Sequence, residues 1–253
     1  MGFEHPLFKA YGMIITIDGT AGSGKSTVAA RLAKKLSVAY LDTGAMYRAI
    51  TWAALQKEVS LDDALALNKL AQNCRIEFLW ENNSSDTTEK YSNPSHEVPE
   101  MEHQRIWLDG KEVTLDIRST QVTESAYKIA QNPHVRVTLV QQQREIAKRS
   151  GTLVTEGRDQ GTVAFPDADY KFYLDAACPT RAKRRWLQLK KKGINENYKK
   201  ILKDLIQRDH RDRTRKVAPL AIPLDAIKID STNLPADQVV ETLYRYIKKE
   251  QLH

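Results

Sequence analysis

The sequence predicts an α/β fold in which helices flank a five-stranded, mostly parallel sheet. Short apolar segments rich in β-branched residues recur along the chain, and stretches with helical periodicity separate most of them. The first segment, MIITI (residues 13–17), ends at Asp18-Gly19, and a helical repeat that includes Val28 and Leu32 follows it. The other strands are predicted over residues 38–42, 152–157, 170–176 and 226–232.

One region departs from this alternation in the first half of the chain. Residues 75–80 and 105–113 are predicted as strands, and the second turns through Asp109-Gly110, a typical hairpin pair. The polar residues 81–103 between them predict a long loop. We therefore expect a small β-containing insertion in the α/β core.

A second irregular region covers residues 178–216. Pro179 lies where the first turn of a helix accepts proline, and Gly193 lies where a helix would end, so two helices are predicted. The expected organisation is an N-terminal extension (1–12), a core (13–74 and 150–253), an insertion with flanking helices (75–149) and a helical lid (about 178–216).

Composition limits the class of protein. The 253 residues suit one globular unit with a sizeable core, and no apolar run approaches the roughly 18 residues of a membrane span. The N-terminus has no basic start followed by a long apolar stretch, so no secretory signal is expected. Cys74 and Cys178 lie far apart with no CxxC motif, which favours a reducing compartment. We expect a cytoplasmic protein without a membrane partner.

The net charge of +7 is concentrated in one segment. Residues 178–216 contain 15 Lys and Arg against 4 Asp and Glu, whereas the rest of the chain has 24 against 28. A nucleic-acid-binding protein would more often be basic across a broad face. The distribution therefore favours a small anionic ligand over a nucleic-acid partner.

A phosphate-binding motif follows the first strand. Residues 19–26, GTAGSGKS, fit G-x-x-x-x-G-K-[ST] between a strand and a helix, where backbone N–H groups and the helix N-terminus can bind phosphates. Lys25 would reach the β- and γ-phosphates of ATP, Ser26 would bind Mg²⁺, and Thr27 would contact the α-phosphate. The predicted ATP-binding residues are Gly19, Thr20, Ala21, Gly22, Ser23, Gly24, Lys25, Ser26 and Thr27.

The motif alone names a superfamily, and other features select within it. A GTPase would need a guanine-reading N-K-x-D, whereas the nearest string, NKLA at residues 68–71, lacks the aspartate. A helicase motor would usually need a second core and a longer chain. A kinase of a small substrate fits the length.

A second anion site is expected beside the phosphate loop. A kinase whose acceptor is phosphorylated must hold two polyanions together, and arginines suit that task because they bind phosphate with two donors and keep their charge. The segments after the second and third strands would meet the phosphate loop at the carboxyl edge of the sheet. Alone, Arg48 could be a solvated helix residue, and Arg158 could form an ion pair with Asp159 or Asp167. The candidates from these segments are Thr43, Tyr47, Arg48, Glu156, Arg158 and Asp159.

The basic segment contains arginines at helical spacing. Residues three, four and seven apart share a helix face, which groups Arg208 with Arg211, Asp212 and Arg215. Asp209 and Arg213 are expected to form a separate surface pair worth about 0.3–0.5 kcal/mol. The earlier helix groups Arg181, Arg184 and Arg185 on one face. Two such faces predict a lid over phosphates, and two solvated basic faces are the alternative.

Together these stretches resemble the bacterial cytidylate kinase family, from Ile14 to about Ile247. The resemblance implies a phosphate-loop kinase core, a CMP-binding insertion and a lid, ATP-dependent phosphorylation of CMP and dCMP, and a monomer. It rests on IDGTAGSGKST, LDTGAMYRA, LDGKEVT followed by IRS, GRDQGTVAFPDA, RAKRRWLQL and RDHRDRTRKVAPL.

The resemblance also implies residue roles on the acceptor side. Arg48, Arg158 and Arg215 would hold the CMP phosphate, while Arg208 and Asp212 would hold the ribose hydroxyls. The stretch NPHVR places an arginine, Arg136, where the family contacts the base, and Asp159 would read the cytosine edge with it. The lid arginines Arg181 and Arg185 would reach the transferred phosphoryl group. The expected catalytic residues are Lys25, Arg158, Arg181 and Arg185.

The chain departs from the family pattern at two positions. Glu156 stands where the family commonly has aspartate, which keeps the charge and lengthens the reach by one methylene. Tyr127 stands where the family commonly has a small serine near the cytosine, so base recognition could differ. Two other interpretations stay open: a phosphate-loop kinase for another nucleotide or small metabolite, and a nucleic-acid-binding ATPase.

Overall fold

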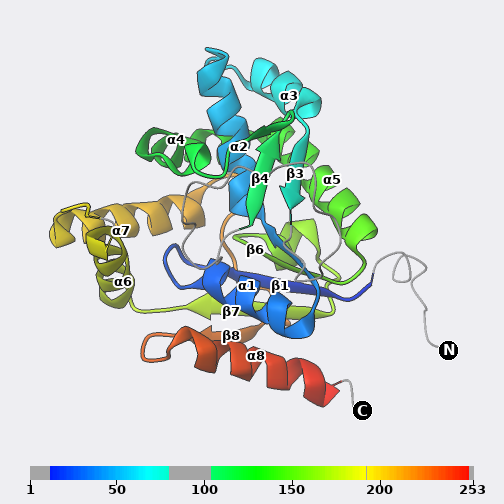
Figure 1. The fold of residues 1–253 in the computed structure, drawn as a ribbon, viewed down its shortest axis with the longest axis vertical. Helices are drawn as coiled ribbons and strands as arrows, with labels where there is room; N and C mark the ends of the chain where they lie inside the picture. Colours follow the sequence, from blue (N-terminus) through cyan, green and yellow to red (C-terminus); the bar gives the residue numbers. More distant parts are fainter. Residues whose placement is uncertain (1–11, 80–103, 192, 251–253) are drawn as a thin grey trace, which may run out of the picture.

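The computed structural model describes residues 12–79, 104–191 and 193–250 (Figure 1). The predicted extension, apart from Gly12, and the predicted loop 81–103 lie outside the described residues. The central sheet has five parallel strands in the order β2-β6-β1-β7-β8. All five predicted strands are thus confirmed: β1 (Ile14–Gly19), β2 (Ala39–Asp42), β6 (Leu153–Gly157), β7 (Tyr170–Asp175) and β8 (Ile227–Asp230).

Helices cover both faces of this sheet because alternate strand residues point to opposite sides. Ile15 and Ile17 belong to the apolar cluster that contains residues of α1 (Lys25–Leu36) and α8 (Ala236–Glu250). Ile14 belongs to the other cluster, with residues of α2 (Thr43–Gln56) and α5 (Pro133–Ser150). Figure 1 shows α1 and α8 together on one side of the strands, and α2 and α5 away from them.

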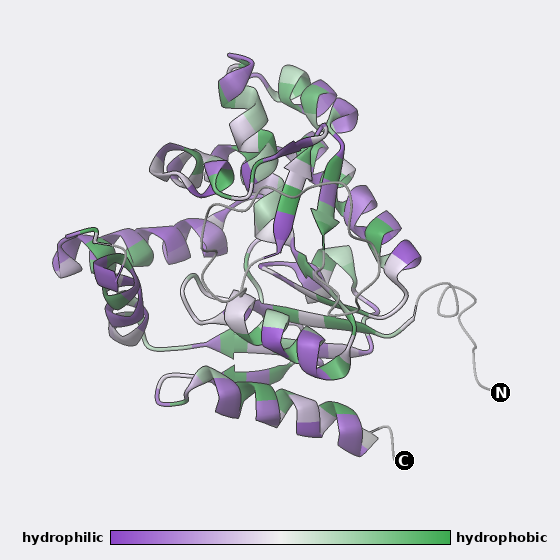
Figure 2. Cartoon of the chain, in the orientation of Figure 1, coloured by the Kyte–Doolittle hydropathy of each residue, from purple (hydrophilic) through white to green (hydrophobic). Residues whose placement is uncertain are grey.

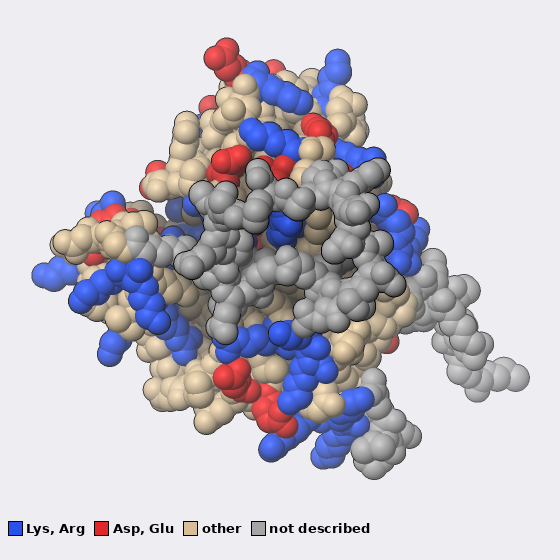
Figure 3. Space-filling model, viewed as in Figure 1, with Lys and Arg blue, Asp and Glu red and all other residues tan. Residues whose placement is uncertain are grey.

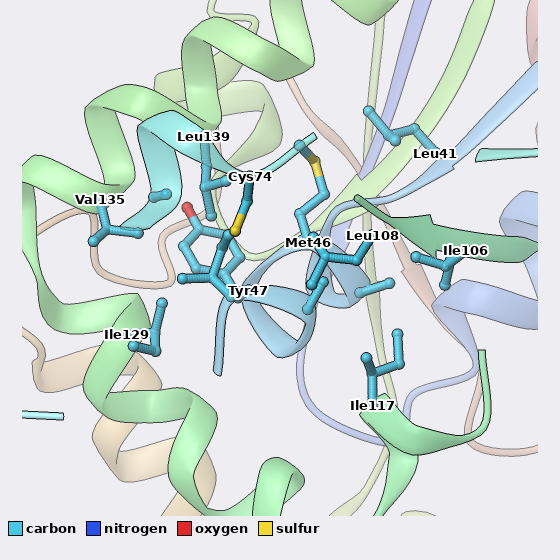
Figure 4. Packing of buried hydrophobic residues seen from close by; sticks show 14 of the residues in the cluster. Leu41, Met46, Tyr47, Cys74, Ile106, Leu108, Ile117, Ile129, Val135 and Leu139 are labelled. Carbon is cyan, nitrogen blue, oxygen red and sulfur yellow. The ribbon is translucent and has the colours of Figure 1, made fainter. Parts of the chain in front are cut away.

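A second, antiparallel sheet lies in the region predicted as the insertion. The predicted hairpin is confirmed, since Asp109 and Gly110 have φ angles of 50° and 81°, the left-handed values that a tight hairpin turn requires. Apolar side chains from this region meet α2 in one core (Figure 4). The region's elements are β3 (Ile76–Leu79), β4 (Arg105–Leu108), β5 (Lys111–Glu112), η1 (Asp116–Arg118) and α4 (Thr120–Gln131), and α3 (Ala64–Asn73) directly precedes them.

The basic segment forms the predicted pair of helices, α6 (Cys178–Lys191) and α7 (Tyr198–Thr214). They project from the sheet beside β7 (Figure 1). Figure 2 shows them as mostly hydrophilic, whereas the strands of the central sheet are mostly hydrophobic. This pair therefore contributes little to the main core and is free to present charged side chains.

The carboxyl ends of the central strands bring distant segments to one edge of the sheet. The phosphate loop follows β1, α2 follows β2, and a short π-helix, η2 (Gln160–Ala164), follows β6. Gly19 ends β1 with a φ of 150°, and a Cβ there would lie 1.9 Å from the carbonyl oxygen of Leu174. Only glycine lets the loop leave β1 so close to β7.

The helices in the described part of the chain include none with the length and apolar character of a membrane span.

Candidate active site

The phosphate loop joins β1 to α1, as the motif predicts. Gly24 precedes the first residue of α1 with a φ of 98°, a conformation that favours glycine. Lys25 Nζ donates to the carbonyl oxygen of Thr20 at 2.7 Å, so the lysine folds back over the loop. Ser26 Oγ donates to Glu156 Oε1 at 2.7 Å, which ties the loop to the end of β6. The loop is thus fixed by its own backbone and by the neighbouring strand.

Burial perturbs the charged groups around this loop. Burial lowers the pKa of Lys25, and the positive charges of Arg158 and Arg208 add to that effect. Burial also raises the pKa of Glu156, with Asp42 adding to the shift. Both side chains are buried, and a bound anion would favour the charged form of Lys25. Such perturbation is typical of a functional site.

The donor set beside the loop fits Mg²⁺. The Ser26 hydroxyl and the Glu156 carboxylate supply oxygen ligands, which are the ligands Mg²⁺ prefers. Within the described parts of the chain, no group of three His, Cys, Asp or Glu residues could hold a metal ion. Mg²⁺ commonly keeps water and phosphate oxygens as most of its ligands, so Ser26 and Glu156 would be sufficient protein ligands.

Arginines from two strand ends reach the same cleft as the loop. Arg48 on α2 pairs with Asp42 at 2.9 Å, and Asp42 also caps α2 by accepting a hydrogen bond from the N–H of Ala45. The alternative in which Arg158 pairs with Asp159 or Asp167 is wrong. Instead, Arg158 Nε donates to Asp212 of α7 at 2.8 Å. Helix α7 is therefore held against the segment that follows β6.

A buried triad of charges lies deeper in the cleft. Asp159 forms an ion pair with Arg136 of α5 and a longer one, at 3.4 Å, with Arg215 at the end of α7. Tyr47 lies under the guanidinium of Arg136, 5.4 Å from its ring centroid. Figure 4 shows Tyr47 within the apolar cluster, which fixes the ring that contacts Arg136. Four elements thus meet at this triad.

The four residues at the C-terminal end of α7 that helical spacing places on one face are turned toward the cleft. Arg208, Arg211, Asp212 and Arg215 all line the cleft. Burial and the neighbouring Arg158 lower the pKa of Arg208 to about 10. The guanidinium of Arg211 lies 4.9 Å from the ring centroid of Tyr127 on α4. This contact joins the predicted lid to the predicted insertion at the mouth of the cleft.

The predicted surface pair of Asp209 and Arg213 is wrong. Asp209 is buried and pairs with Arg181 of α6 at 2.6 Å. Arg181 also donates to the carbonyl oxygen of Ala21 at 2.8 Å, and the N–H of Ala21 points to Asp209 at 3.4 Å. Helical spacing shows which residues share a face but not which face meets the protein. The second predicted lid arginine, Arg185, is exposed and lines the cleft.

The cleft is large enough for two nucleotides. Its volume is about 2790 Å³, whereas a site for one small molecule commonly has roughly 300–1,000 Å³. Figure 3 shows Lys and Arg side chains gathered over α6 and α7. Gly19 and Thr20 are the predicted site residues that do not line it. The others do: 21–27, Thr43, Tyr47, Arg48, Tyr127, Arg136, Arg158, Asp159, Arg181, Arg185, Arg208, Asp212 and Arg215.

Two charged residues carry no predicted role: Asp18, which is buried behind the phosphate loop, and Arg118, which lines the cleft. Asp18 accepts hydrogen bonds from the N–H groups of Gln160 and Gly161, at 2.9 and 2.7 Å, and its burial raises its pKa to about 6. Arg118 of η1 lines the cleft near Asp42. Asp18 directly precedes the phosphate motif, which is a signal for a site residue; Arg118 lies in the IRS stretch, whose spacing carries no such signal.

Comparison with known proteins agrees with this site. A family model described as cytidylate kinase matches residues 15–249. The chain is 41% identical to the cytidylate kinase of Actinobacillus succinogenes, over 94% of this chain and 99% of that protein. It is also 41% identical to cytidylate kinase 1 of Haemophilus influenzae, over 94% of each chain. A bifunctional pantoate ligase/cytidylate kinase from Trichormus variabilis is 42% identical over 93% of this chain and 41% of its own length. The chain belongs to the cytidylate kinase family.

Proposed function

We propose that this chain transfers the γ-phosphoryl group of ATP to a phosphate oxygen of CMP or dCMP, yielding ADP and CDP or dCDP. The observation that carries this proposal is a single cleft that joins a phosphate loop to a pocket of buried arginines. Family membership supplies the nucleotide pair. Two anions must be neutralised side by side for in-line transfer, and this arrangement provides the charge for both.

On the donor side, the backbone of residues 19–27 would bind the ATP phosphates. Lys25 would neutralise the β- and γ-phosphates, and Ser26, hydrogen-bonded to Glu156, would hold Mg²⁺. When bound, Mg²⁺ would neutralise charge between the β- and γ-phosphates. The acceptor oxygen is already anionic, so no strong general base is required. Catalysis would then consist of positioning and charge neutralisation.

On the acceptor side, Arg48, Arg158 and Arg215 would bind the CMP phosphate. Arg208 and Asp212 would bind the sugar hydroxyls. The pair between Arg158 and Asp212 supports this division, because one carboxylate oxygen holds the arginine and leaves the other for a sugar hydroxyl. Thr43 and Tyr47 would complete the pocket wall at the start of α2, where Thr43 Oγ1 donates to the carbonyl oxygen of Glu156 at 2.7 Å.

Base recognition would fall to Arg136 and Asp159. Their buried pairing fixes both side chains before a base binds, so the hydrogen-bond pattern offered to cytosine is set in advance. Tyr127 would close the outer side of the base pocket. Its contact with Arg211 supports this placement, because it brings the phenol ring to the cleft beside α7.

Helices α6 and α7 would act as a lid over the transferred phosphoryl group. Arg181 supports this role by contacting the phosphate loop at Ala21, and Arg185 by lining the cleft with an exposed guanidinium. Closure would exclude water, which otherwise would hydrolyse ATP. We infer the domain division given above, with residues 75–149 as the CMP-binding insertion, and a monomeric, cytoplasmic enzyme.

A nucleotide panel tests the substrate proposal. Release of ADP is measured in a coupled assay with ATP, Mg²⁺ and each of CMP, dCMP, UMP, AMP and GMP. The proposal expects the highest kcat/KM for CMP and dCMP. A clear preference for another acceptor would overturn the substrate assignment, and ATP hydrolysis that requires DNA or RNA would overturn the kinase assignment.

A further inference from the structure

Arg118 is a charged residue of the cleft for which the function above has no use. It ends the short helix η1, directly after the fully buried Ile117. Ile117 packs in the same core as residues of α2 (Figure 4), so the backbone of Arg118 is firmly placed. Its side chain lines the cleft together with Arg48 and Arg158. Arg118 therefore brings positive charge from residues 75–149 to the end of the cleft where α2 begins.

One N–H donor of the Arg118 guanidinium lacks a hydrogen-bond acceptor among the described residues. Its Nε is buried, and no acceptor among the described residues lies within reach of it. Arg48 is in the same position: its Nη2 donates to Asp42, but its Nε is buried without a partner in the described structure. A buried donor left without an acceptor is destabilising, so such atoms in native proteins call for an explanation.

Arg48 and Arg118 also share a carboxylate. Asp42 acts on both arginines, and both lower its pKa, Arg48 more than Arg118. Glu156 acts on Arg118 more weakly, and its carboxylate already accepts a hydrogen bond from Ser26. Burial lowers the pKa of Arg118, which reflects the loss of solvent around its charge. An anion with several acceptor oxygens would supply the missing acceptors and further negative charge beside the two arginines.

We propose that Arg118 is a further binding residue for the phosphate of the acceptor nucleotide, acting beside Arg48. The inference rests on the proposed acceptor site, because a phosphate held by Arg48 comes within the reach of the arginine that shares its carboxylate. A structural role as counter-charge for Asp42 alone does not account for the observations. Asp42 already has Arg48 at 2.9 Å, and that role leaves both Nε atoms unsatisfied.

The proposal makes the phosphate of the acceptor the link between residues 75–149 and the core. Arg48 belongs to α2 and Arg158 follows β6, whereas Arg118 lies beyond the second sheet along the chain. A phosphate bound by all three would draw η1 toward the phosphate loop. A nucleoside without phosphate would bind to the base and sugar contacts and would not engage Arg118.

The test compares CMP with cytidine in Arg118→Ala and Arg118→Lys. Binding of CMP is measured by calorimetry and binding of cytidine by ligand-observed NMR. Arg118→Ala should weaken CMP binding about 10- to 100-fold, the range for a lost hydrogen bond to a charged group, and change cytidine binding less than about twofold. Arg118→Lys keeps the charge without the forked donors, so its loss should be intermediate.

Matched controls separate this role from a structural one. Arg105→Ala removes an arginine of the same region that is paired with Glu112, and it should leave both affinities unchanged. Equal weakening of CMP and cytidine in the Arg118 variants, or no weakening of CMP, would overturn the inference. If Arg118→Ala does not fold, the same comparison is made with Arg118→Lys. Failure of the wild-type chain to phosphorylate CMP would instead overturn the proposed function itself.

Discussion

The two halves of the cleft, proposed to bind the donor and acceptor phosphates, are built in different ways. The donor half is one continuous stretch, residues 19–27, and it relies on backbone geometry, as the φ angles of Gly19 and Gly24 show. The acceptor half collects side chains from α2, α4, α5, α7 and the segment after β6. Its arginines are held by carboxylates, such as the buried Asp159 and the half-buried Asp212.

The two halves differ in construction because they must recognise different parts of a nucleotide. Backbone N–H groups fit any chain of phosphates, so the donor half can be built from small residues at fixed spacing. A nucleotide base and sugar must be read by side chains, and buried arginines need carboxylates to fix them in place. The acceptor half is therefore a network, in which one substitution disturbs several neighbours.

Loss of the donor lysine should have the largest effect. Lys25→Ala removes the cation over the β- and γ-phosphates while the backbone of the loop remains, so kcat should fall about 1,000-fold. Thermal melting should show a folded protein. Lys35→Ala, which removes an exposed partner of Glu241, is the matched control and should keep normal turnover. Near-normal kcat in Lys25→Ala would contradict the donor assignment.

The acceptor half should respond differently to the loss of one arginine. Arg158→Ala leaves Asp212 without its partner and removes a contact to the acceptor phosphate, so kcat/KM for CMP should fall about 100-fold. The KM for ATP should change little, because the phosphate loop keeps its own contacts. Steady-state kinetics with each substrate varied in turn make the measurement. Equal changes in both KM values would erase the proposed distinction between the halves.

Asp18 connects the two halves, and its buried carboxyl group should make stability depend on pH. Its pKa is about 6 in the fold against an ordinary 3.8, so the folded state binds the proton more tightly. Its contribution to the unfolding free energy is fully present below pH 3.8 and is lost as the pH rises to about 6. Between pH 5 and 7.5, the wild-type protein should lose roughly 1–2 kcal/mol more than Asp18→Asn.

The measurement is urea unfolding of both proteins at several pH values. Asp18→Asn also weakens one of the hydrogen bonds to Gln160 and Gly161, which lowers stability at every pH. The pH slope is independent of that constant offset. Identical slopes in the two proteins would show that Asp18 does not titrate in this range.

Tyr127 should give the smallest effect. Its contact with Arg211 bridges α4 and α7, and a cation–π contact at a partly exposed site is worth about 0.5–1 kcal/mol. Tyr127→Ser should therefore raise the KM for CMP about 2- to 5-fold, whereas Tyr127→Phe should stay close to the wild type. A double-mutant cycle with Arg211→Ala checks the contact, and additive effects would show that the bridge contributes nothing.

The donor half and the sheet could be predicted because their signals are local. Each strand is a short apolar run, and the phosphate motif is contiguous, so neither requires knowledge of distant partners. The acceptor residues were assigned through the family resemblance, and the cleft does bring them together. Asp109-Gly110 likewise predicts the hairpin, because the two turn residues are neighbours in the sequence.

The pairing of charges could not be predicted, because it depends on which faces meet in space. Asp209 and Arg213 have good helical spacing for a surface pair, yet Asp209 faces α6 and pairs with Arg181. The partner of Arg158 lies 54 residues away on α7, beyond any local pattern. Arg118 carries no spacing signal, since its place beside Asp42 arises from packing between η1 and α2.

The order of the strands also has a consequence for synthesis. Strand β1 lies between β6 and β7, and its register pairs Ile14 with Leu153 and Ile15 with Tyr170. The ribosome, at about 5–20 residues per second, needs roughly 7 to 27 seconds to add the chain between β1 and β6. The phosphate loop is thus translated well before the strands that flank β1 in the sheet. A nascent chain that stalls before residue 153 exposes both edges of β1, a state suited to chaperone capture or aggregation.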